Sequence, residues 1–394
     1  MRYNNDIKGA LIARLFLRGD QSNQMIIVSE LSKSYGTKVL FDNVSVKFAP
    51  GNRYGLSGPN GAGKSTFMKI LTGEVEASNR GTVVKPRRVG VLKQNQFEFD
   101  EMRIIDTVIM GNAPLWEALA ERNHICELSD ISEEQMNRLG DLETTIADEN
   151  GYMAEIDAAD ILRGIGIEES AHTDLMKTLA TDMKFRVLLA QAVFGNPEAL
   201  LLDEPTNHMD LESIHWLEGF LHEFNGILIV ISHDRHFLNA VCTHIADIDY
   251  DTIIVYPGNY DDMVEAKMSS RSRIESENKD KAKKVAQLQE FVARFAAGQR
   301  SSQVQSRKKE MDRLAPQELK RSNIQRPYIR FEQTKAASRE AVVTLGLAKS
   351  FDDLKVLQNV NLEIMRGDKV AIIGGNGVGK TTLIKLLIKE LEPD

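Results

Sequence analysis

The sequence holds little cysteine and no long apolar run. Cys126 and Cys242 are its two cysteines. Two cysteines cannot build a disulfide framework or a multi-cysteine zinc site, a usage typical of the reducing cytoplasm. No stretch of about 18 consecutive apolar residues is present, so we expect no membrane-spanning helix. A secretory signal is not expected either, because Arg14 interrupts the apolar residues 7–17 and no small-residue cleavage site follows.

The composition is that of a globular protein with an uneven distribution of charge. Apolar residues make up 42% and charged residues 27% of the 394 positions, which excludes global disorder and collagen-like repeats. The net charge is −8, yet residues 267–339 hold 19 Lys+Arg and 8 Asp+Glu. This local reversal indicates a polyanionic partner for the basic stretch. The alternative is a solvated helical face.

An internal repeat divides the chain. Residues 32–66 align without gaps onto residues 348–382, at an offset of 316, and eleven of these 35 positions are identical. Both copies read aromatic residue, strand, glycine turn, strand, glycine-rich loop and helix, which predicts two copies of one module. The second copy continues for 14 residues after Lys380, so we expect it to be truncated.

Two glycine-rich loops, the first loop (58–65) and the second loop (374–381), match the pattern that binds nucleotide phosphates. Glycines let backbone N–H groups turn inward around phosphate oxygens, and the following helix adds positive charge at its N-terminus. Lys64 can reach the β and γ phosphates, and the Ser65 hydroxyl can bind Mg²⁺. The predicted nucleotide-binding residues are Gly58, Pro59, Asn60, Gly61, Ala62, Gly63, Lys64, Ser65 and Thr66, then Gly374, Gly375, Asn376, Gly377, Val378, Gly379, Lys380, Thr381 and Thr382.

Acidic and polar side chains follow the apolar runs. Asp203 and Glu204 end the run 200–202, where Asp203 can hold Mg²⁺ and Glu204 can orient or deprotonate the attacking water. His233, after the run 227–231, can position that water, or it is a helix cap. Gln94 follows a predicted strand at 89–92 and can ligate Mg²⁺ or touch the water.

An aromatic residue precedes each glycine-rich loop at equivalent repeat positions. Tyr35 and Phe351 can stack on adenine by their π faces, with core packing as the rival explanation for each. Tyr35 and Phe351 therefore join Gln94 and the other candidate site residues.

The order of these motifs resembles the ATP-binding cassette (ABC) ATPases. Glu204-Pro205-Thr206-Asn207, Ser232-His233-Asp234-Arg235 and Pro257-Gly258-Asn259-Tyr260 before a basic helical hairpin resemble the ABC-F family of soluble tandem cassettes. The short acidic segment after Gln94 and the run 187–191 look most like the YbiT-like bacterial branch of that family. The resemblance covers residues from about Met25 to the C-terminus.

The resemblance implies an α/β fold, the P-loop NTPase fold of an ABC-type nucleotide-binding domain with a β-subdomain. We expect an extension at 1–24, a first cassette at 25–265 with an acidic helical insertion at about 100–157, a basic helical hairpin linker at 266–339, and the N-terminal part of a second cassette at 340–394. Continuous apolar runs such as 227–231 suit strands buried on both faces of a mainly parallel sheet.

By the same resemblance, ATP and Mg²⁺ are the cofactors, and two cassettes close as a clamp on two ATP molecules in the cytoplasm. The linker would meet ribosomal RNA and tRNA, and the charge of residues 267–339 fits such a partner because phosphate neutralisation drives RNA affinity. The implied function is a ribosome-bound translation factor with ATPase activity.

Two departures from the family pattern weaken the expected hydrolysis. The family signature begins Leu-Ser-Gly-Gly, whereas residues 179–183 read Leu-Ala-Thr-Asp-Met, and Asp182 places a negative charge where phosphate must be capped. The second copy also ends before its own acidic strand, so a cassette of another chain would have to supply a partner. The alternatives are the ATPase subunit of an ABC transporter and a truncated nucleotide-binding protein with little hydrolysis.

Overall fold

The computed structural model describes residues 25–78, 81–92, 97–128, 130–207, 209–249, 251–295, 305, 309, 339–351 and 354–394. The predicted extension at 1–24, the candidate residue Gln94 and most of the predicted linker beyond residue 295 lie outside these residues. None of the helices in the described part of the chain is long and apolar enough to cross a membrane.

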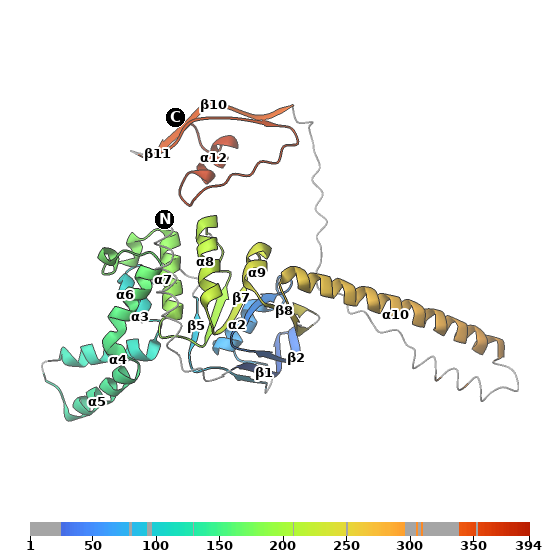
Figure 1. Ribbon diagram of the computed structural model, residues 1–394, viewed down its shortest axis with the longest axis horizontal. Helices are drawn as coiled ribbons and strands as arrows, with labels where there is room; N and C mark the ends of the chain where they lie inside the picture. The colour runs from blue at the N-terminus through green and yellow to red at the C-terminus, as the bar shows by residue number, and fades with distance from the viewer. Residues whose placement is uncertain are drawn as a thin grey trace.

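A six-stranded sheet forms the centre of residues 25–265, the predicted first cassette (Figure 1). Its strands stand in the order β5-β6-β7-β3-β8-β9, and the first five run parallel while β9 is antiparallel to β8. The bounds are β3 Arg53–Ser57, β5 Val89–Val91, β6 Ala199–Asp203, β7 Ile227–Ile231, β8 His244–Asp249 and β9 Thr252–Pro257. Every residue of β7 is buried, as expected for a parallel strand covered on both faces. The predicted parallel sheet and the α/β fold class are confirmed.

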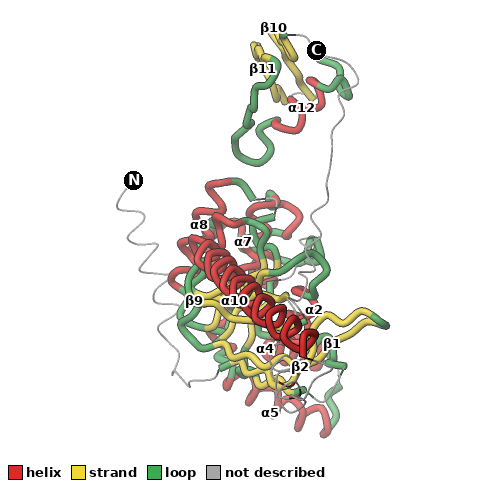
Figure 2. The backbone as a smooth tube through the Cα atoms, turned by 90° about the vertical axis from the view of Figure 1, so that its right-hand side faces the viewer, coloured by secondary structure: helices red, strands yellow, loops and turns green. Residues whose placement is uncertain are grey.

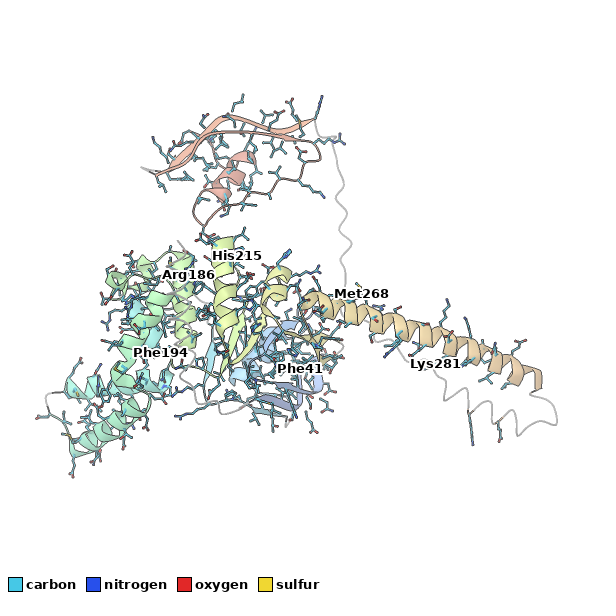
Figure 3. All side chains as sticks on the ribbon, viewed as in Figure 1. Phe41, Arg186, Phe194, His215, Met268 and Lys281 are labelled. Atoms are coloured by element: carbon cyan, nitrogen blue, oxygen red, sulfur yellow. The ribbon has the colours of Figure 1, made fainter. Side chains whose placement is uncertain are left out.

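A smaller antiparallel sheet, in the order β2-β1-β4, covers one face of the central sheet together with helix α2. Its strands are β1 Ile26–Tyr35, β2 Lys38–Phe48 and β4 Thr82–Val84, and α2 spans Lys64–Thr72. Phe41 and Phe48 of β2 are fully buried and lie at 5.8 and 6.3 Å, between ring centroids, from Phe67 of α2. These rings fix α2, and so the loop before it, against the small sheet (Phe41 is labelled in Figure 3).

Helices cover the opposite face and build the acidic insertion. They are α3 Ile104–Ile109, α4 Ala113–Cys126, α5 Glu133–Asp148, α6 Ala154–Gly164, α7 Thr181–Val193, α8 Leu211–Glu223 and α9 Arg235–Val241, with single 3₁₀ turns at Gly151–Met153, Glu169–Ala171 and Met176–Thr178. Within residues 100–157, where the sequence predicts helices, the structure has α3, α4, α5 and the start of α6. Ser132 and Gln135 form a capping box at the start of α5, which satisfies two backbone N–H groups there.

Helix α10, Tyr260–Phe295, extends from the first cassette beside β8 and β9 and points away from the sheet (Figures 1 and 2). Lys267 fixes the N-terminal part of this helix, because its Nζ donates to Asp247 Oδ2 at 2.6 Å and to Asp249 Oδ2 at 2.9 Å. Both carboxyl groups belong to β8. At 1.5 Å per residue the helix is about 54 Å long, so the first arm of the predicted hairpin is present, and its return lies outside the described residues.

The second copy consists of β10 Glu340–Phe351, β11 Leu354–Met365 and α12 Lys380–Leu387. The two strands pair antiparallel, as β1 and β2 do in the first cassette. The strand expected at 369–373, before the second loop, is not formed. Its counterpart β3 lies between β7 and β8, and no described strand offers 369–373 the same pairing. The repeat pattern was therefore wrong for this element, because a strand needs a neighbour for its backbone hydrogen bonds.

Candidate functional site

The first loop joins β3 to α2 at the carboxyl edge of the central sheet. Gly58, Gly61 and Gly63 have φ values of 150°, 75° and 99°, which L side chains rarely adopt. A Cβ on Gly58 would lie 2.6 Å from the Ile248 carbonyl oxygen of β8, so only glycine lets the loop pass this close to the sheet. Helix α2 begins at Lys64 without a side-chain cap, and its first N–H groups remain available to an anion.

The Lys64 ammonium lies over the first loop. Its Nζ donates to the Gly58 carbonyl oxygen at 2.8 Å and to that of Pro59 at 3.4 Å. Burial lowers the pKa of Lys64 below its usual value, while the charges of Glu204 and Asp203 offset part of that effect. The tertiary structure therefore brings the loop lysine and both predicted acids into one electrostatic environment.

Glu204 and His233 meet across neighbouring strands. Glu204 follows β6 and donates its N–H to the Ile231 carbonyl oxygen of β7 at 2.8 Å. Its Oε2 accepts the His233 N–H at 3.2 Å, and its Oε1 lies 3.4 Å from His233 Nε2. Glu204 has a φ of 51°, a left-handed conformation that non-glycine residues adopt at a cost of about 1 kcal/mol or more. The prediction that these two residues act together therefore has a geometric basis.

His233 does not cap a helix, which was the alternative interpretation of this residue. Asp234 is the N-cap of α9, and its carboxylate accepts the N–H groups of His236 and Phe237. The His233 side chain is 64% exposed, whereas that of Glu204 is 16% exposed. His233 is thus free to turn toward a ligand at the edge of the sheet while Glu204 stays held.

The residues at this edge fit a magnesium nucleotide. Asp203 is the last residue of β6 and Ser65 lies in the first turn of α2. Mg²⁺ retains several waters and takes one or two protein oxygens together with phosphates, so one carboxylate and one hydroxyl suffice. No cluster of three or more His, Cys, Asp or Glu side chains suited to a metal occurs in the described part of the chain. Gln94, the third predicted ligand, lies outside that part.

The aromatic candidates sit at hairpin tips rather than in a core. The side chains of Tyr35 and Phe351 are 55% and 45% exposed, which argues against core packing as their role. Lys33 Nζ lies 5.0 Å from the centroid of the Tyr35 ring, and Lys349 Nζ lies 5.9 Å from that of Phe351. Exposed rings at the hairpin tips are available for stacking on a flat base.

The second loop repeats the geometry of the first. Gly377 and Gly379 have φ values of 81° and 100°. Lys380 Nζ donates to the carbonyl oxygens of Gly374 and Gly375 at 2.8 and 2.6 Å. The Asn376 N–H lies 3.4 Å from Asp210 Oδ2 at the start of α8. A hydrogen bond from the Ser213 backbone N–H, with a smaller contribution from that of Asn376, lowers the Asp210 pKa, so this carboxylate is charged where it meets the second loop.

The stretch equivalent to the family signature starts helix α7. Thr181 is its first residue, and the N-cap Ala180 makes no side-chain capping bond. Asp182 lies in the first turn, as the sequence indicates. Sequence reasoning missed Lys184, whose buried ammonium bonds Asp100 Oδ1 at 2.5 Å and lies 5.1 Å from the Phe97 ring. A lysine shortly before the apolar run of α7 was the available signal.

Comparison with known proteins shows which families and proteins this chain is similar to. The family model described as "ABC transporter" matches residues 41–207 and 357–394, and a second model with that description matches residues 246–331. The "Probable ATP-binding protein YbiT" of Escherichia coli O157:H7 is 47% identical over 372 residues, which cover 94% of this chain and 70% of that protein. "ABC transporter F family member 5" of Arabidopsis thaliana is 30% identical and aligns with 92% of this chain and 54% of its own length.

Among solved structures, an ATP-binding cassette of an ABC transporter in its ADP conformation aligns with a TM-score of 0.46 and 19% identity over 60% of this chain and 91% of that chain. The assignment rests instead on the sequence matches, which extend over both glycine-rich loops. Together with the loop geometry and the paired acids at the edge of a parallel sheet, they show that this chain belongs to the ABC family of ATP-binding proteins.

Proposed function

We propose that this chain is an ABC-F-type ATPase of the cytoplasm that binds Mg-ATP at its two glycine-rich loops and acts on the ribosome. The proposal rests on one observation: strand β8 connects the candidate nucleotide site to the long helix α10, the helical arm. Strand β8 contacts the first loop at Gly58 through Ile248, and its residues Asp247 and Asp249 hold Lys267 of α10. A conformational change of the first loop would therefore reach the N-terminal part of α10 through strand β8.

The first loop binds and orients the triphosphate in this proposal. Backbone N–H groups of residues 58–65 and the Lys64 ammonium neutralise the terminal phosphates. Lys64 leaves the Gly58 and Pro59 carbonyl oxygens and turns to the phosphate. Ser65 and Asp203 hold Mg²⁺, which when bound neutralises charge that develops on the phosphates. Thr66 and Tyr35 complete the contacts to the nucleotide.

Glu204 positions the attacking water, and His233 sets the orientation of Glu204. The carboxylate is partly buried and receives the His233 N–H, so one oxygen stays directed at the sheet edge where a water can donate to it. A carboxylate so placed accepts the proton of the water as it attacks the γ-phosphate. We expect hydrolysis to be slow, because Asp182 puts a negative charge in the first turn of α7 and would repel a phosphate from an opposing cassette.

Helix α10 is the proposed arm for a polyanion. Its exposed residues include Arg271, Lys279, Lys283 and Lys284 among acidic ones. Most of the excess positive charge of 267–339 belongs to residues 296–338, of which the structure describes only 305 and 309. Ribosomal RNA is the polyanion that the family resemblance implies. Contacts to phosphates along a helix would give affinity without base recognition.

Ribosome co-sedimentation tests the proposal. A Glu204→Gln variant with ATP retains the bound state, so it should pellet with ribosomes at low salt and dissociate as salt is raised. The matched control is the Lys64→Ala/Lys380→Ala variant, which should not pellet in response to ATP. Absence of ATP-dependent pelleting of Glu204→Gln would contradict the ribosomal role, and co-purification with an integral membrane protein would favour a transporter subunit instead.

A further inference from the structure

A lysine outside the glycine-rich loop reaches the first site from the neighbouring hairpin. Strands β1 and β2 join through Gly36 and Thr37, and Tyr35 pairs directly with Lys38 across this tight turn. Cross-strand partners project from the same face of a sheet, so the ring and the ammonium stand side by side. Lys38 Nζ lies 3.2 Å from the position that a Cβ on Gly61 would occupy, which sets this cation against the middle of the first loop.

The Lys38 ammonium makes no hydrogen bond or ion pair with any residue that the structure describes. Its neighbour Lys33 differs, because Lys33 Nζ donates to the Glu76 carbonyl oxygen at 2.7 Å and lies against the Tyr35 ring. An exposed lysine normally extends into water. Lys38 instead lies beside a loop that already carries Lys64 and a helix N-terminus, so it adds positive charge where an anion is expected.

The second copy of the repeat provides an internal comparison. The pair equivalent to Tyr35 and Lys38 is Phe351 and Leu354, which face each other across the β10–β11 turn. No atom of the residues that the structure describes lies within 4 Å of a Cβ on Gly377, the equivalent of Gly61. Lys349, in contrast, lies over Phe351 as Lys33 lies over Tyr35. The hairpin is thus repeated, while among the described residues a cation lies beside the glycine in the first copy and not in the second.

We propose that Lys38 is a phosphate-binding residue of the first site. It contacts the phosphate chain of a nucleotide whose base stacks on Tyr35, and so it links base recognition to phosphate recognition from a single hairpin. The inference rests on the proposed function, since it requires that the first loop bind ATP. Lys38 contributes to affinity for the nucleotide and takes no part in activating water, because Glu204 and His233 lie on other strands.

Calorimetric titration with Mg-ATP tests the inference on the full chain. All variants carry Lys380→Ala, so that the heat reports the first loop. Lys38→Met should raise Kd about 5- to 10-fold, the effect of losing a partly exposed hydrogen bond to a charged group. Lys38→Arg should keep Kd within about twofold of the parent, since it restores the charge. Lys47→Met, at the far end of β2 and also exposed, is the matched control and should leave Kd unchanged.

The outcomes separate this inference from the function on which it rests. If Lys64→Ala abolishes binding while Lys38→Met matches the parent, the site is a nucleotide site and the inference about Lys38 is wrong. An equal loss in Lys38→Met and Lys47→Met would also overturn it, because the effect would then be one of overall charge. If the parent itself binds no Mg-ATP, the proposed function fails and the inference fails with it. The dependence of Kd on salt should weaken in Lys38→Met, as expected when one cation is lost.

Discussion

Replacing Lys267 by methionine tests how the arm helix is held on the first cassette. Lys267 Nζ contacts Asp247 and Asp249 at 2.6 and 2.9 Å, and the two carboxyl side chains are 5% and 4% exposed while Lys267 is 27% exposed. The variant would remove the Lys267 cation from beside two buried acids. Removing one partner of a buried ion pair costs about 3–5 kcal/mol. Because Lys267 is partly exposed, we expect the free energy of unfolding to fall by about 3 kcal/mol.

The loss should depend on pH in a defined direction. Burial raises the pKa of Asp247 above its usual value, and the hydrogen bond from Lys267 opposes that rise. A folded-state pKa above the unfolded one means that the folded protein gains stability as pH falls through the folded-state pKa. Without Lys267, burial and the charge of Asp249 act unopposed. The destabilisation by Lys267→Met should therefore shrink as pH falls through the raised folded-state pKa of Asp247.

Lys267 does not produce this dependence itself. Burial lowers its pKa, but the hydrogen bonds that Lys267 donates to Asp247 and Asp249, together with the charges of these carboxylates, outweigh burial and hold the pKa above its usual value. A lysine with a raised folded-state pKa contributes its full stability below the unfolded pKa and loses it as pH rises through the folded-state pKa. Its contribution is therefore constant below the usual lysine pKa of 10.5.

Urea unfolding followed by tryptophan fluorescence measures the effect, because both tryptophans, Trp116 and Trp216, lie in the first cassette. Lys284→Met on the exposed part of the same helix is the control and should cost no more than about 0.5 kcal/mol. A loss below about 1 kcal/mol for Lys267→Met would be that of a surface ion pair and would refute the reasoning, as would a destabilisation that does not shrink in acid.

Two further predictions concern the loop and the cysteines. Gly58→Ala should raise the Kd for Mg-ATP at least about tenfold, because its Cβ would lie 2.6 Å from the Ile248 carbonyl oxygen; calorimetry on a variant with unchanged circular dichroism checks it, and unchanged affinity would contradict the close packing. Burial raises the pKa of Cys242 to about 12, whereas Cys126 is exposed. Ellman's reagent should therefore modify one thiol in the folded protein and two in urea, since the thiolate is the reactive form; rapid modification of both without urea would refute it.

Local patterns predicted much of the first cassette. The glycine-rich loops are recognisable because each glycine allows a backbone conformation that other residues rarely adopt. Strands β6 and β7 are recognisable because a strand covered on both faces must be apolar at every position. Asp203 and Glu204 stand out because charges at the end of such a run mark the edge of the sheet. These signals lie within a few residues of one another, so they can be read without knowledge of the fold.

Contacts between distant segments could not be read in this way. The repeat predicted a strand at 369–373, yet a strand depends on its neighbours, and β3 has β7 and β8 whereas 369–373 has no such pair among the described residues. Lys184 stayed unnoticed because its partner Asp100 lies 84 positions away in the sequence. Hydrophobic periodicity carries no information about which charge a buried lysine will meet.

The sequence by itself determined which chemical groups are present: two loops of the phosphate-binding pattern, the acids at a strand end and an aromatic residue before each loop. The tertiary structure decided which of these lie together. It joined Glu204 to His233 through the pairing of β6 with β7, set Lys38 beside Gly61, and attached Lys267 to the strand that backs the first loop. The physical reason is that backbone conformation and burial act locally, whereas a hydrogen bond or an ion pair needs two groups that only the folded chain brings together.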